Sequence, residues 1–217
     1  MNALQFANRA QAGRALAAKL ENYAGRDDVV VLALPRGGVP VAFEIAAYLR
    51  APFDIMIVRK LGVPGHEELA LGAIASGGFC VMNPDVLSAS HISDSELREI
   101  IDREQRELER RELAFRNGHP ALNLEGRTVI LVDDGIATGA TMRAAIQAVH
   151  AQAPLRVIVA TPVAAPETLR ELAAEASEAV AVLTPSNLNS IGEWYFDFTQ
   201  TSGEEVCSLL AKTRPQP

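Results

Sequence analysis

The residues best suited to chemistry lie in one thirteen-residue run, Val129 to Thr141. An apolar stretch is followed by two adjacent carboxylates, Asp133 and Asp134, then a loop of small residues and a helix start. Glycine and alanine let the backbone curl so that its amides face an anion, and the helix dipole supports them. Thr138 and Thr141 add hydroxyl donors, whereas the carboxylates suit sugar hydroxyls, directly or with a metal nearby. The run therefore predicts a site for a ribose 5-phosphate.

Other phosphate and acid motifs fit this run less well. A Walker loop needs lysine where Ala140 stands, and the G-x-G-x-x-G dinucleotide pattern is absent. A haloacid-dehalogenase site would place an acid at Gly135, and no later predicted strand ends in the Asp or Lys of a receiver domain. An ordinary helix cap stays open as the simplest alternative, because acids favour helix starts. A cap explains neither the second acid nor the glycine loop.

Two more segments place suitable groups directly after predicted strands. Arg36-Gly37-Gly38 follows the apolar run 29–34, and such glycines let amides approach a diphosphate that Arg36 could pair with. A plain turn before a helix is the alternative. Arg59 and Lys60 follow the run 53–58, and two cations there suit a pyrophosphate group, unless they are a solvated strand end.

The alternation of apolar runs predicts an α/β fold with a parallel sheet and right-handed crossovers. Further strands are expected at 128–132, 156–161 and 179–183, and helices at 39–49, 141–151 and 166–176. Short strand-like pieces flank Gly77-Gly78. Ligands of such sheets bind beyond the carboxyl ends of the strands, where the polar segments above would meet.

Two helices are expected outside this alternation. The first twenty residues predict a docked amphipathic helix, with a mitochondrial transit peptide as the alternative. Residues 93–116 alternate charges with Leu and Ile and predict one long charged helix, ended by the breakers from Asn117 to Pro120. A solvated face is its default interpretation, and packing of its apolar stripe on a lid or a dimer partner is a hypothesis.

Composition narrows the class of protein. The 217 residues carry 20 basic against 27 acidic side chains, a net charge of -7, so we expect no nucleic acid and no membrane as partners. No apolar run is long enough to span a membrane. The two cysteines lack metal-ligand spacing and favour a reducing, cytoplasmic setting, and no protein metal site is expected.

The run around Asp133 closely resembles the phosphoribosyl pyrophosphate (PRPP) motif of type I phosphoribosyltransferases. Nearly the whole chain is similar to an uncharacterised bacterial subfamily of predicted phosphoribosyltransferases. The similarity rests on Phe6-x-x-Arg9-x-x-Ala12-Gly13, Leu34-Pro35-Arg36-Gly37-Gly38, Val58-Arg59-Lys60, Glu68-x-Ala70-x-Gly72-Ala73 and Tyr195-x-Asp197-Phe198. It implies a type I fold as a single domain over 1–217, with a helical insertion at 93–117 and a small C-terminal hood at 184–203.

The resemblance also assigns roles. Asp133 and Asp134 would hold ribose hydroxyls, and residues 137–141 would wrap the 5-phosphate. The residues implied for PRPP binding are Arg36, Gly37, Gly38, Arg59, Lys60, Asp133, Asp134, Gly135, Ile136, Ala137, Thr138, Gly139, Ala140 and Thr141. The residues implied for catalysis are Asp133, Asp134, Arg36, Lys60 and Glu68. Mg²⁺, bound mainly through PRPP, is the implied cofactor, and a homodimer is expected.

The segment from Leu61 to Gly72 stands where type I enzymes have a mobile lid loop, and Glu68 is its candidate general base. Enzymes for 6-oxopurines place Asp where this loop has Ala137, and a Lys where the turn Thr161-Pro162-Val163-Ala164 is expected. Hypoxanthine and guanine are therefore disfavoured, and the acceptor stays open.

Aromatic residues gather in the expected hood. Trp194 or Tyr195 could stack on a heterocycle, with Asp197 accepting from a ring amine. An aromatic cluster that seals the end of the sheet is the alternative.

The expected activity is transfer of 5-phosphoribosyl from PRPP to a nitrogen acceptor, such as a nucleobase, with release of pyrophosphate. A non-catalytic PRPP- or nucleotide-binding regulator is the alternative. A ribose-phosphate hydrolase is a third possibility, which no G-x-S-x-G elbow or metal cluster supports.

Overall fold

A five-stranded parallel sheet forms the body of the protein, in the order β2-β1-β6-β7-β8. The computed structural model describes residues 5–213, apart from the side chains of Glu67, Glu68 and Thr213. The strands are β1 (Val29–Ala33), β2 (Phe53–Ile55), β6 (Thr128–Val132), β7 (Arg156–Val163) and β8 (Glu178–Leu183). Each pairs in parallel with its neighbours, which confirms the predicted α/β class.

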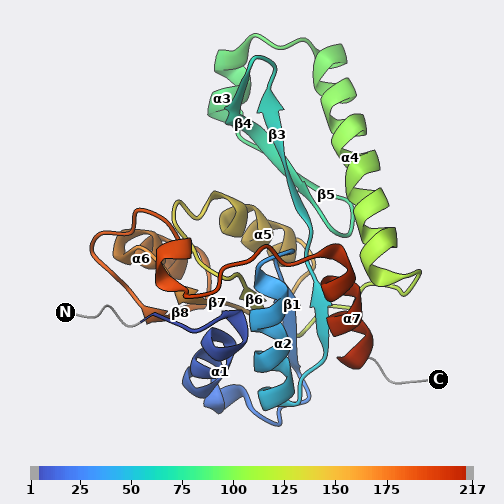
Figure 1. Ribbon diagram of the computed structural model, residues 1–217. Coiled ribbons are helices and arrows are strands. Elements are labelled where there is room, and N and C mark those ends of the chain that lie inside the picture. Colours follow the sequence, from blue (N-terminus) through green and yellow to red (C-terminus); the bar gives the residue numbers. More distant parts are fainter. Residues whose placement is uncertain (1–4, 214–217) are drawn as a thin grey trace.

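Helices cover both faces of this sheet (Figure 1). Helices α1 (Arg9–Lys19) and α2 (Gly38–Leu49) pack on one face, and α5 (Ala140–His150) and α6 (Pro166–Glu175) pack on the other. Successive residues of β1 point to opposite faces, so Val31 joins the core beneath α2 and Leu32 joins the core beneath α5. Burial on both faces explains why this strand is apolar throughout.

A second sheet and a long helix form an arm, residues 58–116, that projects from the body (Figure 1). Strands β3 (Val58–Val63), β4 (His66–Ala75) and β5 (Phe79–Met82) pair antiparallel, followed by α3 (Pro84–Ser90) and α4 (Asp94–Arg116). The loop expected over 61–72 was therefore wrong, because these residues form a hairpin that turns at Pro64 and Gly65. Its glycines had suggested a loop, but Leu61 and Leu71 are fully buried beneath α4.

The predicted charged helix is confirmed as α4. Ser93 and Glu96 form a reciprocal capping box at its start, and Asn117 ends it in a left-handed conformation. Its apolar stripe packs on the β3–β4 hairpin through Ile100 and Leu108, which are 5% and 1% exposed. The helix thus covers the hairpin as well as presenting a charged face.

The C-terminal helix α7 (Gly203–Thr213) was not predicted and joins the arm to the body. It contacts α2 and α4, and its side chains Val206 and Leu210 are buried in the core beneath α2. Two short 3₁₀ turns, η1 (Glu21–Tyr23) and η2 (Gly192–Trp194), complete the elements. Within residues 5–213, no helix is long and apolar enough to cross a membrane.

A buried ion pair anchors the last turn of α4 to the sheet. The Arg116 guanidinium donates to the Asp54 carboxylate over 3.2 Å and to the carbonyl of Ile55 over 2.9 Å. The side chains of Arg116 and Asp54 are 8% and 2% exposed. Arg116 also pairs with Glu112 over 2.6 Å, and Asp54 accepts from the Leu122 amide over 3.3 Å. Removing one partner of a buried ion pair costs more than the pair's net contribution, because the remaining charge stays buried with weaker compensation.

We predict that Arg116→Met lowers the free energy of unfolding by about 3 kcal/mol, since the buried Asp54 carboxylate loses its ion pair with Arg116. Urea denaturation measures this, with the double variant Arg116→Met/Asp54→Asn expected to lose less than the sum of the single changes. Arg98→Met, at an exposed position of the same helix, is the matched control. Equal stability of Arg116→Met and Arg98→Met would contradict the anchoring role.

Candidate active site

The loop between β6 and α5 has the geometry of an anion site. Its Ile136 is fixed to the end of β7, because its amide donates to Val163 and its carbonyl accepts from Ala165. Gly139, which precedes α5, has a left-handed φ of 74° that favours glycine. Within the described residues, the amides of residues 137–139 donate no hydrogen bond to the protein. Unpaired amides ahead of a helix N-terminus suit a phosphate group.

A cavity of about 160 Å³ opens above this loop. The two predicted hydroxyl donors, Thr138 and Thr141, line it and are exposed. From α6, the Thr168 hydroxyl donates to the Ala137 carbonyl over 2.7 Å and so holds this part of the loop. Thr168 had no signal in the sequence, because it lies far along the chain on α6.

The two adjacent acids have different surroundings. Asp133 lines the loop cavity and is half-buried, while its carboxylate accepts from the Asp134 amide over 2.9 Å. Burial raises the pKa of Asp133 above its usual range, and the neighbouring Asp134 charge adds to this. The sequence predicted one shared role for both acids, and the structure separates them.

Asp134 is held by Arg9, which reaches it from α1. Arg9 Nε lies 2.7 Å from Asp134 Oδ2, and its Nη1 donates to the Thr199 carbonyl over 2.7 Å. The guanidinium also lies 4.0 Å from the centre of the Phe198 ring. Arg9 belongs to a quoted family motif, but nothing in the sequence indicated that it would meet Asp134.

The glycine pair after β1 brings two loops into contact. A Cβ at Gly37 would lie 2.0 Å from Asp134 Oδ2, and one at Gly38 would lie 2.6 Å from the Val132 carbonyl. The sequence indicated that these glycines expose amides to a diphosphate, whereas the structure shows them allowing α2 to approach β6. Arg36 is exposed and lines a separate cavity of about 390 Å³.

Arg59 and Lys60 do not end a strand of the parallel sheet, so that expectation was wrong. Both lie in β3, where successive side chains point to opposite faces. Arg59 pairs with the buried Glu104 of α4, and Lys60 lines a third cavity, of about 420 Å³, beside Arg143 of α5. The two predicted cations are therefore divided between opposite sides of the arm.

Glu68, the candidate general base, lies in β4 with its side chain outside the described part of the structure. The expected turn at 161–164 is also different, since β7 continues to Val163 and buries Thr161.

The C-terminal hood segment packs against both the loop and the N-terminal region. A Cβ at Gly135 would lie 2.2 Å from Ile191, which lines the loop cavity. Tyr195 is 4% exposed, and its hydroxyl donates to the Asp134 carbonyl over 2.6 Å. Its ring stacks on Phe198, with ring centres 5.0 Å apart. Tyr195 therefore closes an aromatic cluster and offers no free face to an acceptor.

The other two predicted acceptor residues differ from each other. Trp194 is half-buried, and its indole Nε1 is buried without an acceptor among residues 5–213. Asp197 is exposed and accepts from the Thr199 amide over 2.9 Å, which lowers its pKa. The structure brings Tyr195 and Phe198 together with Arg9, and it leaves Asp197 at the surface.

Among the described residues, no group of three or more His, Cys, Asp or Glu side chains could hold a metal ion. Among the residues that line the loop cavity, Asp133 is the acidic one. Its carboxylate oxygens are the hard donors that Mg²⁺ prefers, and Mg²⁺ usually keeps water and substrate phosphates as its other ligands. A magnesium ion carried by a diphosphate would fit these residues.

The chain belongs to the phosphoribosyl transferase domain family, which matches residues 2–187. Two Mycobacterium tuberculosis proteins, MT0597 and Rv0571c, have names that propose a phosphoribosyl transferase, and each is 46% identical over 206 residues. The match covers 94% of this chain and 46% of each relative, so the chain spans about half the length of these curated relatives.

A crystal structure of the protein TT1426 from Thermus thermophilus has a similar fold, with a TM-score of 0.86 and 41% identity. The match covers 97% of this chain and 100% of that one. The arm is therefore part of a fold that both chains share, and the family identification agrees with the loop geometry.

We predict that Gly37→Ala lowers the free energy of unfolding by about 1–3 kcal/mol, because the added methyl group overlaps the Asp134 carboxylate. A crystal structure of the variant should show the 2.7 Å Arg9–Asp134 contact lengthened or broken. Gly203→Ala is the control, since its Cβ would approach no atom closer than 3.7 Å. Equal stabilities of the two variants in urea would contradict the close contact between the loops.

Proposed function

We propose that this domain transfers the 5-phosphoribosyl group of PRPP to a nitrogen acceptor and releases pyrophosphate. The observation that supports this most is that Thr141 lines both of two neighbouring cavities. One cavity has the unpaired amides and Asp133, and the other has Arg36. A ligand with a phosphate at one end and a diphosphate at the other could occupy both, which PRPP would do.

Different residues would bind the different parts of PRPP. Amides of residues 137–139 and the hydroxyls of Thr138 and Thr141 would hold the 5-phosphate. The carboxylate of Asp133 would accept hydrogen bonds from the ribose hydroxyls, while Arg36 would pair with the diphosphate. Asp134, bound to Arg9, would act by holding the loops together and would not need to contact the sugar.

In the proposed reaction, a nitrogen lone pair attacks C1 of the ribose and the bond from C1 to the diphosphate oxygen breaks. That electron pair leaves with pyrophosphate, and the proton of the acceptor nitrogen passes to water. Magnesium, when bound with the substrate, would supply positive charge to the departing diphosphate. The chain's own contribution is to position the two ends of PRPP and to offset charge through Arg36 and the loop amides.

The hood would cover the acceptor from the side of η2. Ile191 lines the loop cavity and would contact the acceptor, while the half-buried Trp194 would support Ile191 from within the same hydrophobic cluster. Ala137 in the loop disfavours 6-oxopurines, as the resemblance implies. A homodimer and a cytoplasmic setting complete the proposal, and both described cysteines are free, as a reducing compartment favours.

We predict that wild-type protein with Mg²⁺ releases pyrophosphate from PRPP when a panel of nucleobases and other nitrogen compounds includes its acceptor. Asp133→Asn should lower kcat/KM about 10- to 100-fold, because a neutral amide accepts weaker hydrogen bonds from the ribose hydroxyls than a carboxylate does. A coupled pyrophosphate assay measures both.

The matched control is Asp27→Asn, which makes the same charge change just before β1, at the amino ends of the strands. The Asp27 side chain is exposed there. This variant should retain wild-type activity. Calorimetry with PRPP distinguishes the alternatives. Tight PRPP binding without pyrophosphate release for any acceptor would support a regulatory protein and refute the enzyme. Absence of PRPP binding would refute the proposal altogether.

A further inference from the structure

The cavity that contains Arg36 has a second cationic wall, which comes from α4. Arg110, Arg111 and Ala114 of that helix line it together with Arg36 from the loop that follows β1. Thr141, at the start of α5, lines this cavity as well as the loop cavity. Three arginines from two distant segments therefore meet in one cavity of about 390 Å³.

We propose that Arg110 and Arg111 bind the pyrophosphate group of the substrate together with Arg36, so that the arm completes the active site. The inference rests on the proposed function, since it assigns the diphosphate end of the same ligand. The helix was expected to be a solvated face or a packing element, and the family motifs quoted above include neither arginine.

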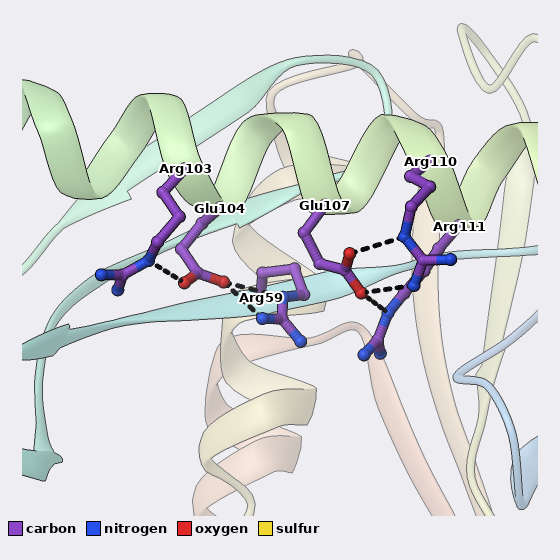
Figure 2. A network of polar contacts seen from close by, with 6 residues as sticks. All are labelled: Arg59, Arg103, Glu104, Glu107, Arg110 and Arg111. Carbon is purple, nitrogen blue, oxygen red and sulfur yellow. Dashed lines mark hydrogen bonds and ion pairs between the residues drawn. The ribbon is translucent and has the colours of Figure 1, made fainter.

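A single carboxylate holds both arginines in place. Glu107 accepts from Arg110 Nε and Nη2 over 2.7 and 2.9 Å, and from Arg111 Nε over 2.7 Å (Figure 2). The two guanidinium groups lower the pKa of Glu107 to about 2, so it stays charged at any physiological pH. Two cations on one anion leave net positive charge, and Arg111 still has its Nη donors for a ligand.

One of the cations that the sequence assigned to the pyrophosphate, Arg59, is bound by Glu104 instead. Arg59 donates through both Nε and Nη2 to Glu104 of α4, and Arg103 donates to the other oxygen of Glu104 over 3.0 Å (Figure 2). Arg59 does not line the cavity. Helix α4 therefore binds one predicted cation through Glu104 and contributes two other arginines to the cavity that Thr141 also lines.

The ligand class follows from the chemistry of the wall. Guanidinium groups bind phosphate oxygens in pairs of hydrogen bonds, and fixed guanidiniums lose little freedom on binding. As the bond from C1 breaks, negative charge grows on the diphosphate, and arginines there would stabilise it. The net charge of -7 for the whole chain does not reveal this local positive charge.

A purely structural role is the rival explanation. Ion pairs three and four residues apart, such as those of Glu107, also stabilise an isolated helix by a few tenths of a kcal/mol. That role would not depend on whether a side chain lines the cavity. Arg106 is exposed on the same helix and does not line it, so it serves as the comparison.

The test is calorimetric titration of Arg110→Gln/Arg111→Gln with inorganic pyrophosphate and with ribose 5-phosphate, both in the presence of Mg²⁺. We expect pyrophosphate affinity to fall about 10- to 100-fold, as the loss of charged hydrogen bonds implies, and ribose 5-phosphate affinity to stay within about twofold. Arg106→Gln should match the wild type for both ligands. The single change Arg111→Lys, which keeps the charge, should lose several-fold for pyrophosphate only.

The outcomes separate this inference from the proposed function. Unchanged pyrophosphate affinity in the double variant would overturn the inference, even if the wild type releases pyrophosphate from PRPP. Equal losses for both ligands would also overturn it, because they would indicate a general disturbance of the site. Loss for pyrophosphate alone, in a protein that turns over no acceptor, would support the arginine site and refute the enzyme.

Discussion

The contact between Arg9 and Asp134 is the interaction on which the rest of the site depends. It joins α1 to the loop after β6, over 2.7 Å between side chains that are 10% and 14% exposed. Gly37 permits the contact by leaving room for the carboxylate, and Tyr195 binds the carbonyl of the same aspartate. Four segments distant in sequence are thereby fixed around one residue.

This arrangement explains why two adjacent acids can serve one ligand differently. The carboxylate of Asp134 satisfies a buried arginine, which would otherwise be an uncompensated charge. Asp133 is left to line the cavity above the phosphate loop. One acid thus stabilises the site and the other is available to a ligand, and the glycine pair after β1 contributes packing.

The arm depends on the body in a comparable way. The Arg116–Asp54 pair fixes the end of α4 to the sheet, while α7 packs between α4 and α2. Because α4 is held at this end, Arg110 and Arg111 are placed one or two turns before the anchor and beside the carboxyl edge. A helix that covers a hairpin can therefore also supply charge to a cavity.

Local patterns predicted most of the body. The apolar run at 128–132 is β6 without a shift, and α4 covers the charged run predicted over 93–116 and ends at the breaker Asn117. Each signal is contained within a few neighbouring residues, so the sequence expresses it directly. The phosphate loop was recognisable for the same reason, since its amides, glycines and hydroxyls are contiguous.

The errors concern contacts between distant segments. Arg59 was assigned to a ligand because the sequence does not show that Glu104 faces it across the arm. Glycines in 61–72 suggested a loop because the burial of Leu61 under α4 is a tertiary effect. Tyr195 was assigned to an acceptor because its hydrogen bond to Asp134 spans 61 positions. Such pairings are decided by the fold and leave no local pattern.

The most direct measurement is a crystal structure of the protein with ribose 5-phosphate and Mg²⁺ bound. The account predicts that the phosphate lies within hydrogen-bonding distance of the amides of residues 137–139, with a ribose hydroxyl at Asp133. A phosphate bound instead in the cavity beside Lys60 and Arg143, with the loop empty, would contradict it.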